Sequence, residues 1–253
     1  MININKNLQS INFKNRRILI TGASRGLGAA VYEWLINENA NVLAIGRGKP
    51  DFEVLKKNSF LKLDLSEQLN VEELIKRTIN FQPDTIIHCL GGGFKKSNDL
   101  ISKSDLLYLL NMNFIIGLEI NNAILPSMIK NKKGWIIHFS SIATKEITAS
   151  VGYTCVKSLI EPYVKLMGRK YIVDNIYISG IILGAISGNN GALDRLSKSN
   201  NQIYEKFIKE RRPTLRSTPI NELLSYLNLL LSENAKIHSS NMITLDEAEG
   251  ISL

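Results

Sequence analysis

The sequence contains very little cysteine. Cys89 and Cys155 are the only two among 253 residues, the first inside an apolar run and the second inside a helical pattern. Two cysteines placed in this way do not indicate the disulfide framework that holds many small secreted proteins together. We therefore expect a reducing environment.

Long apolar runs are also missing. No stretch approaches the roughly 18 apolar residues that a membrane-spanning helix needs. Residues 1–15 mix polar and apolar side chains instead of forming the apolar segment of a signal peptide. These absences predict a cytoplasmic protein with no membrane partner and a flexible N-terminus over residues 1–15.

Acidic residues are fewer than basic ones. The chain has 31 Lys and Arg against 23 Asp and Glu, a formal charge of +8, which raises the question of a polyanionic partner. There is no long basic arm and no zinc-finger or helix-turn-helix signature, so we expect no nucleic-acid partner. A solvated surface is the ordinary interpretation of the basic clusters, and attraction of a phosphorylated cofactor or substrate is the alternative. The clusters are Lys56-Lys57, Lys95-Lys96, Lys132-Lys133 and Arg211-Arg212.

Short apolar runs alternate with longer segments of helical period, as in parallel strands joined by crossover helices. The composition, 44% hydrophobic and 21% charged, is that of an ordinary globular protein. No repeat or low-complexity linker divides the chain, so we expect a single domain over residues 1–253. The predicted fold class is α/β, a doubly wound parallel sheet of about seven strands flanked by helices.

The predicted strands are Arg17–Thr21, Val42–Ile45, Phe60–Leu63, Thr85–Leu90, Trp135–Phe139, Asn175–Ile178 and Met242–Leu245. The predicted helices are Gly26–Asn37, Val71–Asn80, Asp105–Met128, Val151–Arg169 and Ile220–Leu231. Residues 181–212 begin rich in glycine and then become polar and helical. We interpret them as a mobile flap over a site, with a long surface excursion as the alternative.

The first predicted strand runs directly into a glycine-rich turn, Thr21-Gly22-Ala23-Ser24-Arg25-Gly26-Leu27-Gly28, and then into a helix. Glycines permit a tight turn and a close approach of backbone N–H groups to a pyrophosphate, whose charge the helix N-terminus favours. A glycine cluster alone could be a plain turn. Its position after the first strand predicts a dinucleotide site in a Rossmann-like fold.

The second predicted strand is followed by Arg47, with no carboxylate at the position where an NAD-specific site binds the adenosine 2′-hydroxyl. This absence favours NADPH/NADP+ as the cofactor. Arg25 and Arg47 are expected to bind the 2′-phosphate through charge-assisted hydrogen bonds. A solvated loop arginine is the alternative for Arg47.

Tyr153 and Lys157 lie four residues apart in a helical pattern, and therefore on one face of the predicted helix. Roughly one such pair is expected by chance in a chain of this composition, so the pair needs context. The strand upstream ends in Ser140-Ser141, which places two hydroxyls at the carboxyl end of the sheet, where open α/β sheets bind ligands.

Together, these motifs resemble the short-chain dehydrogenase/reductase family, whose glycine motif T-G-x-x-x-G-x-G is matched by Thr21, Gly22, Gly26 and Gly28. The resemblance covers nearly the whole chain and implies a catalytic group of Asn113, Ser141, Tyr153 and Lys157. Tyr153 would give a proton to the substrate oxygen, and Ser141 would hydrogen-bond the same oxygen. Lys157 and the oxidised nicotinamide would lower the pKa of the phenol. Lys157 would also hold the nicotinamide ribose, and Asn113 would position a water.

Two of these assignments have alternatives. Ser140 competes with Ser141, because Ser141 lies only 12 residues before Tyr153 and a shortened loop must be assumed. Both serines could also act as caps at the strand end. Asn111 competes with Asn113, and a buried asparagine bonded to the backbone is the structural alternative.

The resemblance also implies a set of cofactor-binding residues and no metal. The set is Gly22, Ser24, Arg25, Gly26, Leu27, Gly28, Arg47, Asp64, Leu65, Gly91, Tyr153, Lys157 and Ile182. Asp64 would contact the adenine ring, and Gly91-Gly92 would lie beside the adenosine ribose. His88, His138 and His238 lack metal-ligand spacing with the cysteines, and His88 and His138 are expected in the core.

Three family patterns are altered in this chain. Cys89-Leu90-Gly91-Gly92 stands in place of Asn-Asn-Ala-Gly, Ser179-Gly180 in place of Pro-Gly, and Asp246-Glu247-Ala248 in place of Asp-Gly-Gly. The four catalytic positions are intact. The changes affect nicotinamide placement and C-terminal packing.

The predicted activity is NADPH-dependent reduction of a carbonyl in a small molecule, or oxidation of the corresponding alcohol. The polar flap residues Asn189, Asn190, Asp194 and Arg195, with Gly91–Gly93 and Tyr163–Lys170, resemble relatives in bacterial surface-sugar pathways. A keto-sugar or nucleotide-linked sugar is therefore the favoured substrate, which would place the enzyme in carbohydrate biosynthesis. The alternatives are 3-oxoacyl-carrier-protein reduction and a non-catalytic NADP-binding scaffold or redox sensor. The family resemblance also implies a homodimer or homotetramer, built across the two long helices.

Overall fold

A computed structural model describes residues 12–52, 59–146 and 148–252. Its centre is a seven-stranded sheet in the order β3-β2-β1-β4-β5-β6-β9, in which every neighbouring pair is parallel. The strands are β1 Arg17–Thr21, β2 Asn41–Gly46, β3 Ser59–Lys62, β4 Thr85–His88, β5 Gly134–Ser141, β6 Ile176–Leu183 and β9 Met242–Leu245. The predicted doubly wound sheet is confirmed.

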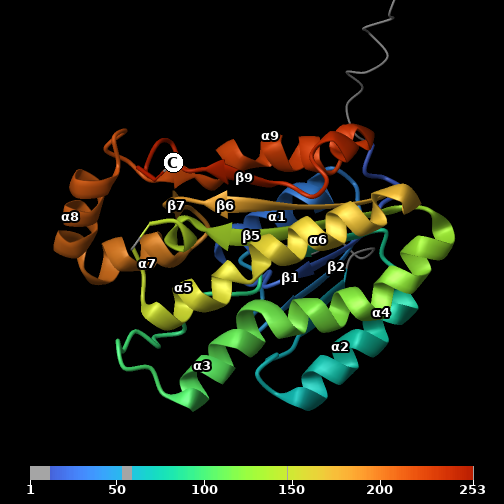
Figure 1. The fold of residues 1–253 in the computed structure, drawn as a ribbon, viewed down its shortest axis with the longest axis horizontal. Coiled ribbons are helices and arrows are strands. Elements are labelled where there is room, and N and C mark those ends of the chain that lie inside the picture. Colours follow the sequence, from blue (N-terminus) through green and yellow to red (C-terminus); the bar gives the residue numbers. More distant parts are fainter. Residues whose placement is uncertain (1–11, 53–58, 147, 253) are drawn as a thin grey trace, which may run out of the picture.

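Helices cover both faces of this sheet (Figure 1). One face packs against α1 (Gly26–Asn37) and α9 (Ile220–Leu230). The other packs against α2 (Gln68–Phe81), α4 (Ile116–Asn131) and part of α6 (Ile160–Tyr171). Within β1, Ile18 and Ile20 belong to the first core and Leu19 to the second. Successive side chains of a strand point to opposite faces, so a strand covered on both sides is apolar throughout.

The predicted helix Asp105–Met128 is interrupted in the structure. It consists of α3 (Lys103–Leu110), a π-helical turn η2 (Asn111–Ile115) and α4. The segment 103–131 is long and apolar enough to cross a membrane by length and composition, but it packs against the sheet as a core helix, with Ile120 and Ile124 buried. Isolated π-turns within α-helices frequently occur at functional sites, and this one carries Asn113.

Strand ends differ from the sequence prediction where glycines or strand pairing intervene. β4 ends at His88, not Leu90, and the chain then enters Gly91 and Gly92 with φ of 155° and 137°. β6 begins after Asn175, whose φ is 56°. It continues to Leu183, because residues 181–183 pair with residues 139–141 of β5.

The predicted flap is a helical excursion on a two-stranded base. β7 (Ile186–Ser187) pairs with β8 (Thr218–Pro219), and between them lie α7 (Ala192–Ser199) and α8 (Asn201–Arg211). α7 and α8 lie at one end of the sheet in Figure 1. The predicted bounds 181–212 are wrong at the start, because residues 181–183 belong to β6.

A second prediction, that the pair Arg211-Arg212 is solvated, is wrong for Arg212. Its side chain is fully buried, and its guanidinium contacts Glu247 at 2.9 Å and Glu249 at 3.0 Å. Burial of an arginine requires paired carboxylates of this kind. Because Glu249 also accepts the N–H of Ala185, this cluster joins the base of the flap to the loop after β9.

Three further predictions concern the Lys56-Lys57 cluster, the N-terminus and the two cysteines. Lys56-Lys57 and residues 1–11 lie outside the described residues. Phe13 is buried and packs edge-on against Trp34, so the predicted flexible N-terminus does not extend to residue 13. Cys89 and Cys155 are both free, as expected.

Candidate active site

The predicted catalytic side chains come from three segments at the carboxyl end of the central strands. Ser141 is the last residue of β5, Asn113 lies in the π-turn, and Tyr153 and Lys157 lie on α5 (Val151–Ser158). The Lys157 Nζ atom is 6.0 Å from the centroid of the Tyr153 ring. The helical spacing therefore places the phenol and the ammonium on one face, as predicted.

Ser141 lies beside the Tyr153 phenol, near enough to lower its pKa. The Oγ atom of Ser141 also accepts the N–H of Ala143 at 3.2 Å, at the start of a short 3-10 turn. A serine hydroxyl has one hydrogen to donate, and its bond from Ala143 leaves that hydrogen available. Ser141 therefore combines the expected capping contact with a position beside the phenol.

Ser140 points elsewhere. It is buried, and its hydroxyl donates to the backbone oxygen of Lys157 at 3.4 Å. Consecutive residues of a strand face opposite sides, so only one of the two serines can meet Tyr153. The geometry brings Ser141 to the phenol and Ser140 to the backbone of α5.

Lys157 is buried beneath the turn that follows β4. Its Nζ atom donates to the backbone oxygen of Phe139 at 2.8 Å. A Cβ atom on Gly91 would lie 3.1 Å from Nζ and 2.8 Å from Asn113 Oδ1, so Lys157 and Asn113 converge at Gly91. Burial lowers the pKa of Lys157 to about 8, because a low-dielectric environment disfavours the charged amine.

Asn113 holds the same turn. Its Oδ1 atom accepts the N–H of Gly92 at 2.9 Å, and its Nδ2 atom donates to Gly92 O at 3.1 Å and to Leu109 O at 2.9 Å. The amide is therefore bonded to backbone atoms, which was the structural alternative for this residue. Its direct effect is to fix the Gly91–Gly93 turn above Lys157.

In the protein by itself the pKa of Tyr153 is raised, whereas the predicted lowering relies on the charge of the oxidised nicotinamide as well as that of Lys157. Burial raises the pKa of the phenol, and the neighbouring Ser141 lowers it only in part. Lys157 makes no contribution to this shift. The phenol accordingly stays protonated at neutral pH, which is the form that donates a proton.

The glycine turn between β1 and α1 forms a cradle that side chains would fill. A Cβ atom on Gly22, whose φ is 73°, would lie 2.8 Å from the backbone of Cys89 and Leu90. A Cβ atom on Gly28 would lie 2.3 Å from Gly22 O. The close approach of backbone to backbone, ending at the N-terminus of α1, fits the diphosphate of a dinucleotide.

The residues predicted to surround the adenosine lie at the neighbouring strand ends. Ser24 Oγ accepts the N–H of Gly48 at 3.1 Å, which ties the glycine turn to the loop after β2. Arg25 and Arg47 are both exposed at these two turns. Asp64 Oδ1 accepts two bonds from Ser66 and thereby shapes the turn after β3.

Leu65 and Ile182 were also predicted to contact the cofactor. Both side chains are buried, at 3% and 1% exposure. Any contact that these two residues make with a dinucleotide must therefore come from their backbone atoms. Leu27, the remaining predicted residue, is partly buried at the start of α1.

A buried polar network that the sequence analysis missed lies behind the site. Asn121 of α4 uses its whole amide: Oδ1 bonds His88 Nε2 at 2.8 Å, and Nδ2 bonds His138 Nε2 at 3.2 Å and the Tyr163 hydroxyl at 3.0 Å. His138 must be neutral to accept the amide N–H. Burial lowers the pKa of His88 to about 4 and that of His138 well below its ordinary value.

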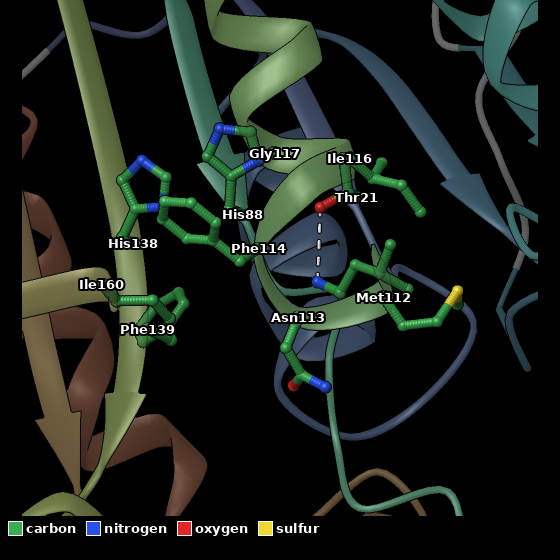
Figure 2. A pocket seen from close by; sticks show the side chains of 11 residues that line it. Thr21, His88, Met112, Asn113, Phe114, Ile116, Gly117, His138, Phe139 and Ile160 are labelled. Carbon is green, nitrogen blue, oxygen red and sulfur yellow. Dashed lines mark hydrogen bonds between the residues drawn. The ribbon is translucent and has the colours of Figure 1, made fainter. Parts of the chain in front are cut away.

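The two histidine rings stack at 4.5 Å between centroids and line a cavity of about 20 Å³, which reaches Asn113 and Thr21 (Figure 2). Thr21 Oγ accepts the N–H of Leu90 at 3.3 Å at its edge. The expectation of core histidines is confirmed by their burial. An asparagine on the apolar face of a predicted core helix, Asn121, is the sequence signal that could have revealed the network.

Comparison with known proteins identifies relatives over most of the chain. The family model described as short chain dehydrogenase matches residues 16–197. The chain is 30% identical over 198 residues to a 3-ketodihydrosphingosine reductase from Bacteroides thetaiotaomicron, covering 76% of this chain and 73% of that protein. It is 26% identical over 205 residues to a dehydrogenase/reductase SDR family protein 7-like from Drosophila melanogaster, covering 74% of this chain but only 63% of that relative's length.

Solved structures share the fold at low sequence identity. A 3-oxoacyl (acyl-carrier-protein) reductase from Agrobacterium tumefaciens with NADP bound has a TM-score of 0.83 and 20% identity, covering 98% of this chain and 99% of that chain. L-sorbose reductase from Gluconobacter frateurii, complexed with NADPH and L-sorbose, has a TM-score of 0.81 and 18% identity, covering 97% and 100%. Other structures with this fold hold NADH or NAD+.

Proposed function

Because the chain belongs to the short-chain dehydrogenase family, we propose that it is an NADP(H)-dependent reductase that converts the carbonyl group of a small polar substrate into an alcohol. Family membership assigns an oxidoreductase that uses a nicotinamide cofactor. The choice of NADP(H), the substrate class and the roles of individual residues are our proposal. One observation carries it: the partly buried Tyr153 phenol lies beside Ser141 and one helical turn from Lys157.

Tyr153 acts as the proton donor. Burial raises the pKa of the phenol, so it keeps its proton at neutral pH and can give it to the substrate oxygen as negative charge develops there. Ser141, which lies beside the phenol, donates its hydrogen to the same oxygen and stabilises that charge. Both groups are held by secondary structure, so their positions need little adjustment during the reaction.

Lys157 and Asn113 hold the cofactor side of the site. Lys157 binds the nicotinamide ribose from beneath Gly91, and Asn113 fixes the Gly91–Gly93 turn through its amide. The bound dinucleotide supplies the hydride. The chain supplies orientation and charge stabilisation, which distinguishes this proposal from a non-catalytic scaffold.

The preference for NADP(H) is supported by charge at two turns. β2 ends at Gly46 and is followed by Arg47, without a carboxylate for the adenosine 2′-hydroxyl. Arg25 and Arg47 bind the 2′-phosphate. Equal or tighter binding of NADH than of NADPH would refute this assignment.

A keto-sugar or nucleotide-linked sugar is the proposed substrate, supported by the polar character of the flap and by the shared fold of an L-sorbose reductase. A 3-oxoacyl thioester is the second candidate, because a 3-oxoacyl-carrier-protein reductase also shares the fold and the basic surface suits an acidic carrier. NADPH oxidation with a panel of keto-sugars and 3-oxoacyl thioesters separates the two. Tight NADPH binding without turnover of any carbonyl would favour a scaffold.

Replacement of Tyr153 tests the chemistry directly. We expect Tyr153→Phe to reduce kcat by roughly 100-fold or more, the contribution typical of a general acid, with NADPH affinity changed less than about twofold. Tyr226→Phe on α9, where the side chain is exposed, is the matched control and should leave kcat unchanged. Near-normal turnover by Tyr153→Phe would remove this residue from its proposed role.

We further propose a cytoplasmic homodimer or homotetramer built across the two long helical segments, residues 103–131 and 151–171. Apolar side chains exposed on α6, such as Leu166 at 68%, support contact with another copy. Light scattering on the purified chain gives the number of copies.

A further inference from the structure

Arginine side chains from three separate parts of the chain gather near the glycine turn. Arg25 lies in the turn itself, Arg47 follows β2, and Arg195 lies on α7 in the flap. Partial desolvation lowers the pKa of Arg25, and the positive charges of Arg195 and Arg47 lower it further. Like charges that repel each other in this way favour binding of an anion between them.

These arginines have no acidic partner in the part of the chain that the structure describes. The ion pairs of residues 12–52, 59–146 and 148–252 involve other cations, including Arg16, Arg77 and Arg211. Arg212 and Arg216, by contrast, are each paired with carboxylates. The positive charge near the glycine turn is therefore uncompensated within the described residues.

The tip of the flap touches the glycine turn. The N–H of Gly26 donates to Asn189 O at 2.6 Å, and a Cβ atom on Gly26 would lie 3.3 Å from Gly191 Cα. Two glycines thus allow the backbones of the flap and the turn to meet. The contact lies one residue from Arg25.

The same tip fixes the position of Arg195. Asp194 accepts the N–H groups of Gly188 and Gly191 at 3.0 Å, which closes the loop before α7. Arg195 Nη1 then donates to Asn190 O at 2.7 Å, so the guanidinium folds back toward the loop that meets Gly26. Arg195 approaches the turn because the flap tip is docked on it.

We propose that Arg195 is a third phosphate-binding residue, carried by the flap, which binds a phosphate of the dinucleotide together with Arg25 and Arg47. This inference rests on the proposed function and deepens it. The phosphate is either the adenosine 2′-phosphate or the diphosphate, since both lie near the glycine turn and offer the same chemistry to a guanidinium. Binding of either one favours the docked flap, so that cofactor affinity and flap closure are coupled.

Binding of cofactor fragments to the full chain tests this role without measuring activity. Titration calorimetry at fixed ionic strength would compare 2′,5′-ADP and 5′-ADP on the wild type, Arg195→Gln and Lys198→Gln. Lys198 is exposed on the same helix and is the matched control for loss of one positive charge. We expect Arg195→Gln to weaken at least one fragment about tenfold, the value of one charge-assisted hydrogen bond, and Lys198→Gln to weaken neither beyond about twofold.

The pattern of losses identifies the phosphate. A loss for 2′,5′-ADP alone assigns Arg195 to the 2′-phosphate. A loss for 5′-ADP alone assigns it to the second phosphate of the diphosphate, and a loss for both fragments assigns it to the first 5′-phosphate, which they share. Equal affinities of Arg195→Gln and Lys198→Gln for both fragments overturn the proposal. Arg195→Lys, which keeps the charge, should recover part of the affinity, and thermal unfolding of each variant shows whether it is folded.

A parallel titration of the wild type with 5′-AMP, which lacks the 2′-phosphate, separates this inference from the proposed cofactor preference. Wild-type binding of 2′,5′-ADP no tighter than 5′-AMP would refute the preference for NADP(H). The 5′-ADP measurement would then decide the role of Arg195 by itself. The phosphate-binding role of Arg195 and the preference for NADP(H) would therefore be refuted by different observations.

Discussion

Ala248 adopts a backbone conformation that glycine takes at low cost. Its φ is 59° and that of Glu247 is 49°, at the two positions where the family resemblance has Gly-Gly. Asp246 holds the turn by accepting the N–H groups of Ala248 and Gly250 at 3.2 and 2.9 Å. The carboxylate of Glu247 contacts Arg212 and Arg216. Ion pairing in this chain thus offsets the backbone strain that glycines would avoid.

Ala248→Gly should therefore stabilise the protein. The left-handed conformation costs a non-glycine residue roughly 1–2 kcal/mol, and the greater freedom of glycine in the unfolded chain offsets part of the gain. We expect the free energy of unfolding to rise by roughly 0.5–1 kcal/mol, measured by urea denaturation at pH 7. Ala30→Gly within α1 is the contrasting control and should lower it by about 1 kcal/mol. A less stable Ala248→Gly would show that the turn carries no strain.

Lys157, which we propose to bind the nicotinamide ribose, is buried at a cost to its charged form. Its pKa is lowered from 10.5 to about 8 by burial, so the charged amine is less stable in the folded protein than in the unfolded chain. Lys157→Met should abolish turnover yet raise the free energy of unfolding at pH 7 by roughly 1–3 kcal/mol. The lost hydrogen bond to Phe139 O reduces this gain.

The effect of Lys157 burial on the free energy of unfolding depends on pH. Between pH 8 and 10.5 the unfolded wild type binds more protons than the folded form, so the burial penalty of Lys157 is relieved as pH rises. The stability difference between Lys157→Met and wild type should therefore shrink from pH 7 to pH 9.5. A difference that is constant over this range would contradict the lowered pKa.

The polar network anchors an entire helix. Asn121 joins α4 to His88 on β4, to His138 on β5 and to Tyr163 on α6. α4 continues directly from the π-turn that carries Asn113. A buried, fully satisfied polar contact specifies one alignment of a helix on a sheet better than apolar packing does. We interpret Asn121 as a positioning residue for the turn above Lys157.

Asn121→Leu should lower the free energy of unfolding by about 2–4 kcal/mol, because it leaves buried groups of two histidines and a tyrosine unpaired. Asn122→Leu, on the exposed side of the same helix, is the matched control and should change it by less than about 0.5 kcal/mol. Urea denaturation gives both values. A positioning role further predicts that Asn121→Leu lowers kcat at a temperature where the variant remains folded. Unchanged kcat would limit Asn121 to stability.

The two buried histidines make the folded protein sensitive to acid. The groups that face them are Asn121, Tyr163 and Lys157, and no carboxylate contributes to the pKa shift of either ring. Because the folded pKa of His88 is about 4, against 6.5 for an ordinary histidine, the unfolded chain binds more protons between these values. Stability from this group is complete above pH 6.5 and is lost as the pH falls toward 4.

We expect His88 alone to account for a loss of about 3 kcal/mol between pH 7 and pH 4. Urea denaturation at pH 7.5, 5.5 and 4.5 would measure the slope of stability against pH. His88→Gln should flatten this slope, whereas His238→Gln, outside the network, should leave it unchanged. Parallel slopes for the two variants would place the acid sensitivity elsewhere.

The flap connects the two ends of the site through contacts distant in sequence. Its base is joined to the loop after β9 by Arg212 and Glu249, and its tip meets the glycine turn at Gly26. The base is held by buried ion pairs, while the tip is held by one backbone hydrogen bond and a glycine contact. This asymmetry suits a segment that stays anchored and opens at its tip.

Features set by neighbouring residues could be read from the sequence alone. The bounds of β1 and α1 agree with prediction, because a run of apolar residues, a glycine turn and a helical period follow one another directly. The placement of Tyr153 and Lys157 on one face needed only the helical repeat. The seven-stranded parallel sheet followed from the alternation of apolar runs and helical segments.

Only the packed structure decided which distant groups meet. Strand register turns Ser141 and not Ser140 toward Tyr153, and contacts across more than 30 residues bury Arg212 and join His88 to Asn121. The pKa of Tyr153 rises because burial, a property of the whole packed site, outweighs the effect of the neighbouring Ser141. Periodicity along the chain reports how a segment folds. Burial and charge at a site depend on segments that are close only after the chain has folded.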